Sequence, residues 1–261
     1  MSTALVTGAT AGIGLSFAHQ LAERGHDVVL VARDRVRLEN LSDELRAKYK
    51  VGTEILVADL SDRADTGKVS ERLSDAARPV DLLVNNAGYS LKKRFLDNDI
   101  TEEEALFDVL CRAVFVLSHA AARAMRERGH GAIVNVSSVA GFITSGTYSA
   151  EKSFVTVFTE GLSGELAGSG VTATALCPGF THTEFHDRAG INMSGIPEFM
   201  WLDAHRLVRD CLDDVAKGKV VSVPGGQYKA IVALLRVVPR GLVRSRARTV
   251  HRPKDGSKGS R

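Results

Sequence analysis

The sequence predicts an α/β fold, a single doubly wound domain in which helices flank a seven-stranded parallel sheet. Short runs of β-branched and aliphatic residues alternate with longer amphipathic stretches, which is the pattern of βαβ units. No internal repeat or low-complexity segment interrupts this alternation. A chain of 261 residues is also long enough for one large domain with a substantial buried core.

The apolar runs predict seven buried strands, at residues 4–7, 28–32, 55–58, 82–84, 132–136, 172–176 and 220–223. Helices are expected between them, near residues 13–24, 34–48, 62–76, 101–127, 148–168 and 203–216. A connection near residues 178–201 and the C-terminal tail fall outside the alternation. We therefore expect one folded domain over residues 1–226 and a tail over residues 227–261.

The composition is that of an ordinary globular protein. Hydrophobic residues make up 44% and charged residues 25% of the chain, which is typical of soluble domains. The three cysteines are far apart and form no C-x-x-C motif, which favours reduced thiols over a disulfide scaffold. The N-terminus runs directly into a strand pattern and shows no secretory signal. These features predict a cytoplasmic protein.

The first predicted strand ends in a glycine-rich turn, Thr7-Gly8-Ala9-Thr10-Ala11-Gly12-Ile13-Gly14, which leads into a helix. Glycines in such a turn let the backbone approach a pyrophosphate and let the helix pack closely on the strand. The N–H groups and the dipole at the helix N-terminus favour the negative charge. The turn is therefore a candidate dinucleotide site; a purely structural glycine turn is the alternative.

The end of the second predicted strand, Ala32-Arg33-Asp34, bears on the choice of dinucleotide. A fold that binds NAD tends to place a carboxylate here for the ribose 2′-hydroxyl, whereas an arginine nearby accommodates the 2′-phosphate of NADP. Ala32 removes the acid and Arg33 supplies the cation. The sequence thus favours NADP(H) as cofactor, with NAD(H) still possible; the alternative is that Arg33 only solvates the start of a helix.

Tyr148 and Lys152 are four residues apart in a predicted helix, so both side chains project from the same face. A phenol is a poor acid at neutral pH because its ordinary pKa is roughly 10. An ammonium beside it favours the phenolate, so we expect Lys152 to lower the pKa of Tyr148. Such a pair can protonate an oxygen or take a proton from one; a solvated helix face is the alternative.

Together, these motifs resemble the short-chain dehydrogenase/reductase family over residues 2 to about 225. Asn85-Asn86-Ala87-Gly88 is similar to its N-N-A-G element, and Tyr148 with Lys152 is similar to its Y-x-x-x-K motif. The resemblance implies a Rossmann-type catalytic domain that binds NADP, with Ser138, Tyr148 and Lys152 as catalytic residues. The expected cofactor-binding residues are Gly8, Thr10, Gly12, Ile13, Gly14, Arg33, Asp59, Leu60, Asn86, Ala87, Gly88, Tyr148, Lys152, Pro178, Gly179 and Thr183.

The resemblance also implies a mechanism. NADPH delivers hydride to a carbonyl carbon while Tyr148 protonates the developing alkoxide. Ser138 would hold the carbonyl oxygen near the phenol, and its neighbour Ser137 is the alternative for this role. Lys152 would lower the pKa of Tyr148 and bind the nicotinamide ribose. The overall pattern is most similar to the ketoacyl and hydroxysteroid reductase branch of the family.

Two departures from the family pattern bear on catalysis. Leu110 stands where many members carry an asparagine that supports a water chain from the lysine to solvent, so the proton path should differ. The interval from Ser138 to Tyr148 is also shorter than usual, which suggests a trimmed loop at residues 143–147. Leu110 supports an alternative function, that of a cofactor-binding regulatory or scaffold protein with weakened catalysis.

The connection after Pro178 is rich in apolar residues, including Phe180, Phe185 and Trp201. In the family, the corresponding segment, here about 180–201, forms the substrate lid. We therefore expect a hydrophobic ketone and secondary alcohol pair, such as a 3-oxoacyl or steroid-like substrate; a small satellite core is the alternative. His182 and His186 in this segment do not form an H-E-x-x-H motif, and no metal site is expected.

The predicted helix at residues 148–168 carries four small residues, Gly161, Gly164, Ala167 and Gly168. They would let a second helix approach closely. The resemblance makes an isologous interface in a homodimer or homotetramer plausible here; packing inside the monomer is the alternative.

The tail is strongly basic. Residues 227–261 contain ten Lys or Arg and one Asp, so the net charge of +3 leaves about −6 for residues 1–226. The apolar run at 229–238 is too short to span a bilayer, which needs about 20 residues. An apolar segment joined to a basic one can instead lie on an anionic membrane surface. A solvated or partner-packed tail is the other interpretation, and nucleic-acid binding is the least favoured.

Overall fold

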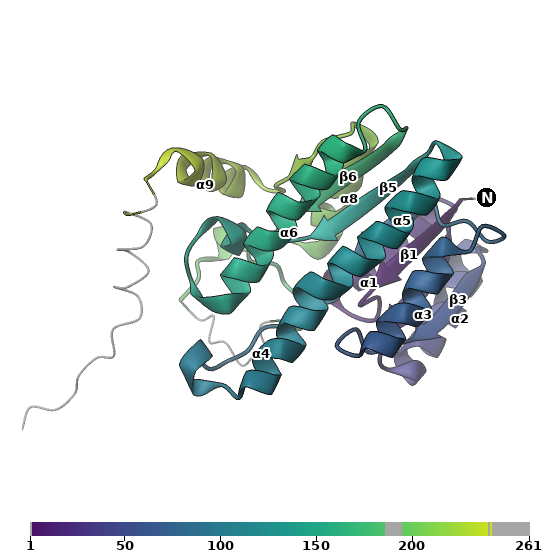
Figure 1. Ribbon diagram of the computed structural model, residues 1–261, viewed down its shortest axis with the longest axis horizontal. Helices are drawn as coiled ribbons and strands as arrows, with labels where there is room; N and C mark the ends of the chain where they lie inside the picture. The colour runs from purple at the N-terminus through teal and green to yellow at the C-terminus, as the bar shows by residue number, and fades with distance from the viewer. Residues whose placement is uncertain (1, 186–194, 240, 242–261) are drawn as a thin grey trace, which may run out of the picture.

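The computed structural model describes residues 2–185, 195–239 and 241. Its strands form one parallel sheet in the order β3-β2-β1-β4-β5-β6-β7, with helices on both faces (Figure 1). The strands are β1 (Thr3–Thr7), β2 (Asp27–Ala32), β3 (Thr53–Val57), β4 (Leu82–Asn85), β5 (Gly131–Val136), β6 (Val171–Leu176) and β7 (Val221–Ser222). The predicted doubly wound α/β fold is confirmed.

The helices form a layer on each face of the sheet. They are α1 (Gly12–Glu23), α2 (Arg35–Tyr49), α3 (Arg63–Ser74), α4 (Ile100–Phe107), α5 (Val114–Arg128), α6 (Gly146–Glu165), α8 (Ala204–Ala216) and α9 (Gly226–Val237). Apolar residues of α1, α2 and α8 join one core cluster, and those of α3, α5 and α6 join the other. Each face of the sheet is therefore buried under its own set of helices, which explains the uninterrupted apolar runs of the strands.

Aspartates cap the start of four of these helices, α2, α3, α4 and α8, and three of these caps share one geometry. The carboxylates of Asp34, Asp62 and Asp203 each accept a hydrogen bond from the main-chain N–H three residues later, at the start of α2, α3 and α8. A capping carboxylate satisfies an N–H group that has no partner inside the helix. The local sequence thus fixes where the connections after the strands end.

The predicted helix at 101–127 is one continuous rod that contains a π-helical turn. α4 leads into the turn η2 (Asp108–Ala113), which leads into α5. The rod from Ile100 to Arg128 is long and apolar enough to span a membrane. However, Leu106, Leu117 and Met125 are fully buried against the rest of the protein, so it is a core helix. The π turn inserts one extra residue beside the sheet's carboxyl edge, and such turns are frequent at functional sites.

The segment predicted as a tail begins with a folded element. α9 starts at Gly226, and its Tyr228 and Val232 are buried against the body. Residues 242–261, which hold most of the basic side chains, lie outside the described residues. The functional division between a domain ending at 226 and a tail stays a prediction.

The order of the strands reverses direction beside β1. β1 lies between β2 and β4, and Val6 of β1 pairs with Val84 of β4. Ligands of doubly wound sheets bind outside the carboxyl ends of the strands at this switch point. The glycine turn that follows β1 and the Asn86–Gly88 segment that follows β4 therefore meet where a dinucleotide would bind.

Candidate active site

The glycine turn after β1 has the backbone geometry that its sequence predicts. Gly8 and Gly12 have φ angles of +65° and +54°, which side chains other than glycine rarely adopt. At Gly14, an added Cβ would lie 2.2 Å from the carbonyl oxygen of Gly8. The turn therefore requires these glycines and leaves its main chain open to a ligand. The N-terminus of α1 at Ala11 has no side-chain cap, so its N–H groups remain suited to a phosphate.

The Asn86 segment braces this turn from the neighbouring strand. Asn86 donates from Nδ2 to the carbonyl oxygens of Thr7 and Gly8, at 3.0 and 3.3 Å. In return, Thr7 Oγ1 accepts from the main-chain N–H groups of Asn86 and Ala87, at 2.9 and 3.0 Å. The glycine turn and the Asn86–Gly88 segment, which flank the switch point, thus form one hydrogen-bonded unit. The main role of Asn86 is to hold the glycine turn in place.

Arg33 and Asp59 face each other at the ends of β2 and β3. The Arg33 guanidinium lies 3.7 Å from the Asp59 carboxylate and is 73% exposed. Partial burial of Asp59 opposes ionisation, but hydrogen bonds from Ser61 and the charge of Arg33 hold its pKa below the usual value. An exposed guanidinium held by a weak surface pair remains available to a phosphate. The neighbouring Leu60 is buried in the core, so mainly its main chain is open to a ligand.

The remaining turn residues have different surroundings. Ile13 is partly buried and packs against the core cluster beneath α1. Thr10 lies in the turn itself and is partly exposed. These two residues and the glycines line one continuous stretch of main chain, which is the part of the predicted set that a pyrophosphate would contact.

Ser138 is the serine that faces Tyr148. The Ser138 side chain lies near enough to the Tyr148 phenol to lower its pKa, against the larger effect of burial. The Ser138 hydroxyl donates a 3.5 Å hydrogen bond to the Pro178 carbonyl oxygen. Ser137, the alternative, is buried, and its Oγ lies 2.6 Å from the Lys152 carbonyl oxygen and 2.7 Å from Thr156 Oγ1. Ser137 therefore anchors α6 to the sheet, whereas Ser138 is oriented toward the site.

Lys152 lies below the phenol ring and is almost completely buried. Its ammonium donates a 2.8 Å hydrogen bond to the Val136 carbonyl oxygen and lies 5.7 Å from the centroid of the Tyr148 ring. Burial lowers the pKa of Lys152 to about 8, partly offset by Cys111 and Glu151. An ammonium with this pKa can release and regain a proton near neutral pH.

The structure differs from the expectation that Lys152 lowers the pKa of Tyr148. Burial of the phenol raises the pKa of Tyr148, with the nearby Ser138 hydroxyl as the main opposing effect. The physical reason is that a desolvated phenolate is costly, and the ammonium is directed at the Val136 carbonyl rather than at the phenol oxygen. In the protein alone, Tyr148 is therefore a protonated group, ready to donate.

Leu110 occupies the space beside this ammonium. It is fully buried in the π turn, and its Cδ2 lies 2.7 Å from the position that a Cβ on Gly88 would take. Lys152 Nζ lies 3.9 Å from the same position. Leu110 packs with Leu106, Cys111 and the Tyr148 ring. The Leu110 side chain thus forms an apolar wall of the candidate site.

Two buried carboxyl groups near the site were not singled out from the sequence. Glu103 of α4 and Glu151 of α6 are each 6% exposed, and each has one carboxyl oxygen without a hydrogen-bond partner. Burial and then the charge of Glu103 raise the pKa of Glu151 to about 7. In the sequence alone, each would be read as a solvated helix residue, and only tertiary packing shows that both are buried.

The segment after β6 links two parts of the site: the turn that contains Ser138 and the glycine turn after β1. The Pro178 carbonyl oxygen accepts from the Val139 N–H at 2.9 Å. Thr183 lies against Gly12. Its Cβ is 3.0 Å from the position that a Cβ on Gly12 would take. The Phe185 ring lies 6.0 Å from the Tyr148 ring. The structure therefore brings Pro178, Thr183 and an apolar side chain to the same face as the catalytic candidates.

The histidine pair in this segment gives no metal site among the described residues. His182 pairs with Glu198 at 3.1 Å and stacks on Trp201, while His186 lies outside the described residues. Within residues 2–185, 195–239 and 241, no group of three or more His, Cys, Asp or Glu side chains could hold a metal ion.

Comparison with known proteins identifies the family. A family model described as short chain dehydrogenase matches residues 2–193. Sulfoacetaldehyde reductase 2 from Chromohalobacter salexigens is 37% identical over 186 residues, which cover 69% of this chain and 73% of the relative. The chain belongs to the short-chain dehydrogenase/reductase family, and it is an oxidoreductase of that family.

Two solved structures agree with this over nearly the whole chain. A short-chain dehydrogenase from Sphingobium yanoikuyae in complex with NADPH has a TM-score of 0.84 and 36% identity, and covers 99% of both chains. The bulky-bulky ketone specific alcohol dehydrogenase from Comamonas testosteroni has a TM-score of 0.79 and 30% identity, over 98% of this chain and 97% of that chain.

Proposed function

We propose that this protein is an NADP(H)-dependent reductase that interconverts a hydrophobic ketone and the corresponding secondary alcohol, with Tyr148 as general acid and base. One observation carries the proposal: the Ser138 hydroxyl, the Tyr148 phenol and the Lys152 ammonium lie close together, with the ammonium beside Gly88. This arrangement can bind a carbonyl oxygen and supply it with a proton.

The cofactor is NADP(H), and the chain's own residues fit it. The turn at Gly8, Gly12 and Gly14 leaves the main-chain room that a pyrophosphate needs. Arg33 presents an exposed cation at the end of β2, where a 2′-phosphate would lie. The similar Sphingobium dehydrogenase binds NADPH, which supports the same choice here. When bound, the reduced cofactor supplies a hydride to the carbonyl carbon.

The protein's residues supply the proton and the orientation. Ser138 donates a hydrogen bond to the substrate oxygen and holds it near the phenol. Tyr148 is protonated because burial raises its pKa, so it can give its proton to the oxygen as negative charge develops. Because the pKa of Lys152 is about 8, its ammonium can pass a proton back toward the phenolate that remains.

The substrate is a hydrophobic ketone, such as a 3-oxoacyl or steroid-like compound. The Phe185 ring is tilted against the Tyr148 ring, with centroids 6.0 Å apart, and the Phe180 and Trp201 ring centroids lie 6.0 Å apart in the same connection. Apolar rings around a few polar groups favour an apolar ligand. The ketone named for the Comamonas enzyme is bulky, which supports a large substituent on the carbonyl carbon.

The test is NADPH consumption with 3-oxoacyl and steroid ketones, measured beside NADPH binding. We expect turnover in the wild type, and a Tyr148→Phe variant that still binds NADPH but turns over about 10²- to 10⁴-fold more slowly. Tyr148→Phe reducing substrate at the parental rate would exclude the acid assignment. NADPH binding without turnover on any ketone would favour a cofactor-binding regulatory or scaffold protein, to which Leu110 already points.

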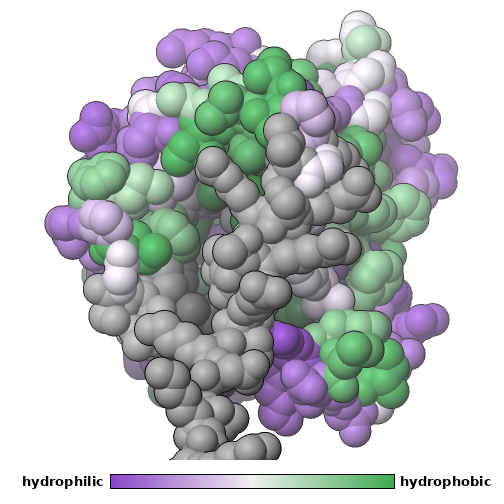
Figure 2. Space-filling model, turned by 90° about the vertical axis from the view of Figure 1, so that its left-hand side faces the viewer, coloured by the Kyte–Doolittle hydropathy of each residue, from purple (hydrophilic) through white to green (hydrophobic). Residues whose placement is uncertain are grey.

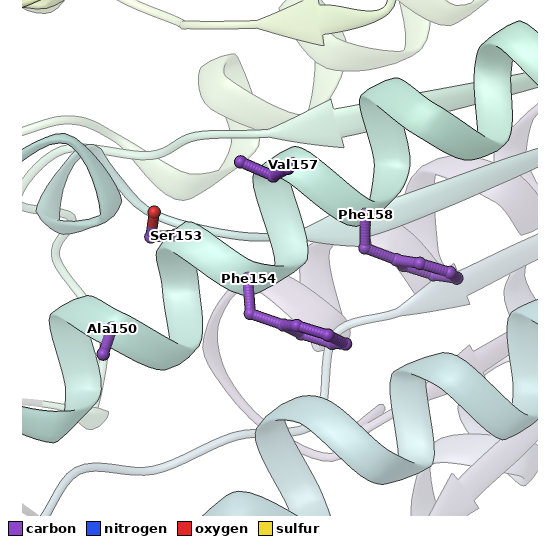
Figure 3. A pocket seen from close by; sticks show the side chains of 5 residues that line it. All are labelled: Ala150, Ser153, Phe154, Val157 and Phe158. Atoms are coloured by element: carbon purple, nitrogen blue, oxygen red, sulfur yellow. The ribbon is translucent and has the colours of Figure 1, made fainter.

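We propose that the protein forms a homodimer or homotetramer through the outer face of α6. Phe154, Val157 and Phe158 line a shallow apolar hollow on this helix with Ala150 and Ser153 (Figure 3). Phe115 of α5, which lies 5.5 Å from Phe158, is 51% exposed and extends the apolar surface. Val157→Glu should dissociate the oligomer in light scattering, whereas an unchanged mass would exclude this face.

We further propose peripheral contact with anionic membranes through α9 and the basic tail. Leu234 and Val237 of α9 are 61% and 77% exposed. On the face of the molecule shown in Figure 2, apolar residues gather in the upper part, at the height of α9 in Figure 1. Because Tyr228 is buried, the test deletes only residues 242–261. Liposome flotation should fall after this deletion; equal flotation of both forms would exclude the proposal.

A further inference from the structure

Tyr228 anchors helix α9 to the body of the protein. This residue is 2% exposed and is one of the largest fully buried side chains. Its ring lies against Gly179, where an added Cβ would come within 2.0 Å of the ring carbon Cζ. Gly179 is therefore required at this position because the tyrosine ring fills the space of a side chain.

The Tyr228 hydroxyl joins two segments that are far apart in sequence. The Phe180 N–H donates to Tyr228 Oη at 2.9 Å, and the hydroxyl donates to the Met200 carbonyl oxygen at 2.6 Å. Phe180 and Met200 lie at the two ends of the connection between β6 and α8. One side chain of α9 thus holds both ends of the segment expected to cover the substrate.

A short ladder of main-chain contacts continues from this junction. Leu202 N–H donates to the Phe180 carbonyl oxygen at 2.8 Å, and His182 N–H donates to the Leu202 carbonyl oxygen at 3.0 Å. Thr181 and Leu202 form a parallel β-bridge. The Tyr228 hydroxyl bonds to the Phe180 end of this ladder, so the ladder and the Tyr228 side chain form one connected unit.

This unit leads directly to the active site. Immediately before Gly179, the Pro178 carbonyl oxygen accepts from the N–H of Val139, which follows Ser138. Beyond the ladder, Thr183 lies against Gly12 of the cofactor turn. The contacts from α9 therefore reach the turn that contains Ser138 on one side and the glycine turn after β1 on the other.

Only a neutral phenol can make both hydrogen bonds. The oxygen must accept from Phe180 N–H while its own hydrogen is donated to Met200. Burial raises the pKa of Tyr228, which keeps the hydroxyl protonated. Phenylalanine would preserve the ring packing on Gly179 but would leave a buried N–H and a buried carbonyl oxygen without their partner.

We propose that Tyr228 is a positioning residue that couples α9 to the cofactor-binding segment at 178–183, so that NADPH binding and the seating of α9 stabilise each other. Coupling of this kind is reciprocal: a cofactor that orders the segment must also favour the docked helix. A membrane or protein that pulls α9 away would weaken NADPH binding. The inference rests on the proposed NADP(H) function of the same site.

The experiment is hydrogen–deuterium exchange of the full chain with and without NADPH, beside a fluorescence titration of NADPH. In the wild type, NADPH should slow exchange in α9 as well as at residues 178–183. In Tyr228→Phe, we expect the NADPH dissociation constant to rise about three- to tenfold and the protection of α9 by NADPH to disappear. At saturating NADPH, kcat should change less than the KM for NADPH.

Gln227→Ala is the matched control, because it removes the neighbouring hydrogen bond from Gln227 Nε2 to the Phe199 carbonyl oxygen, at 3.2 Å. This variant should keep the protection and the NADPH affinity. If wild-type protein binds NADPH but hydrogen exchange in α9 does not change, the inference is overturned and the proposed function is not. The same holds if NADPH still protects α9 from exchange in Tyr228→Phe. Wild-type protein that does not bind NADPH would overturn the proposed function together with it.

Discussion

Leu110 and Lys152 approach the same point above Gly88. A Cβ placed on Gly88 would lie 2.7 Å from Leu110 Cδ2 and 3.9 Å from Lys152 Nζ. An apolar methyl group therefore lies near the ammonium that, in the proposed mechanism, restores the proton given up by Tyr148. Because the methyl group cannot bind water, proton exchange between Lys152 and solvent has to pass elsewhere or be slow.

Leu110→Asn tests this relationship. The amide would replace a fully buried apolar side chain in a cluster with Leu106 and Cys111, so we expect the free energy of unfolding to fall by about 1–3 kcal/mol. At the same time the amide can hold a water beside Lys152, so we expect kcat to rise and its solvent isotope effect to shrink. Urea unfolding and steady-state kinetics check the two outcomes.

Leu110→Met is the control, since it keeps the site apolar at similar volume. Its stability should stay within about 1.5 kcal/mol of the wild type, with an unchanged isotope effect. Equal kinetics in the asparagine and methionine variants would mean that Leu110 does not limit proton transfer.

Glu151 should make the protein less stable as the pH rises through neutrality. Burial and the Glu103 charge raise its pKa to about 7, above the value of about 4.3 for an unfolded chain. The folded state then binds more protons than the unfolded state between these two values, so this group's contribution to stability is present at acidic pH and is lost as the pH rises to about 7. Urea unfolding from pH 5 to 8 should show a loss of about 1–3 kcal/mol.

Glu151→Gln should flatten this part of the stability profile, because the amide cannot ionise. Glu103→Gln should flatten it less, since it removes the repulsion but leaves Glu151 buried. Parallel profiles for the wild type and Glu151→Gln would contradict the raised pKa.

The fold and the positions of most candidate site residues could be predicted from sequence because both depend on local patterns. Apolar runs specify strands, and the glycines at 8, 12 and 14 are required by the φ angles and contacts of one turn. The direction of the Tyr148 pKa could not be predicted, because it depends on burial by residues distant in sequence. Glu103, Glu151 and Tyr228 were missed for the same reason: their roles come from helix packing, and their local sequence resembles that of a solvated surface.

Ser137 and Ser138 should separate stability from catalysis. Ser137 Oγ is buried within hydrogen-bond distance of the Lys152 carbonyl oxygen and of Thr156 Oγ1, so Ser137→Ala should lower the free energy of unfolding by about 1–3 kcal/mol with little change in kcat. Ser138→Ala removes the hydroxyl that faces Tyr148, so kcat should fall about 10²- to 10³-fold. Thermal unfolding and single-substrate kinetics on both variants test the assignment, and the reverse pattern would assign the role to Ser137.

Arg33 should determine the preference for NADPH over NADH. Its guanidinium is 73% exposed and is held by Asp59 at 3.7 Å, so a 2′-phosphate can recruit it at little cost. Arg33→Ala should weaken NADPH binding about 10- to 100-fold, because a charge-assisted hydrogen bond contributes about 1.5–3 kcal/mol, and should leave NADH binding almost unchanged. Arg35→Ala is the matched control, since this arginine pairs within its own helix with Glu39 at 3.8 Å. Dissociation constants for both cofactors, measured at two salt concentrations, decide the question, and equal losses for NADPH and NADH would exclude a phosphate contact at Arg33.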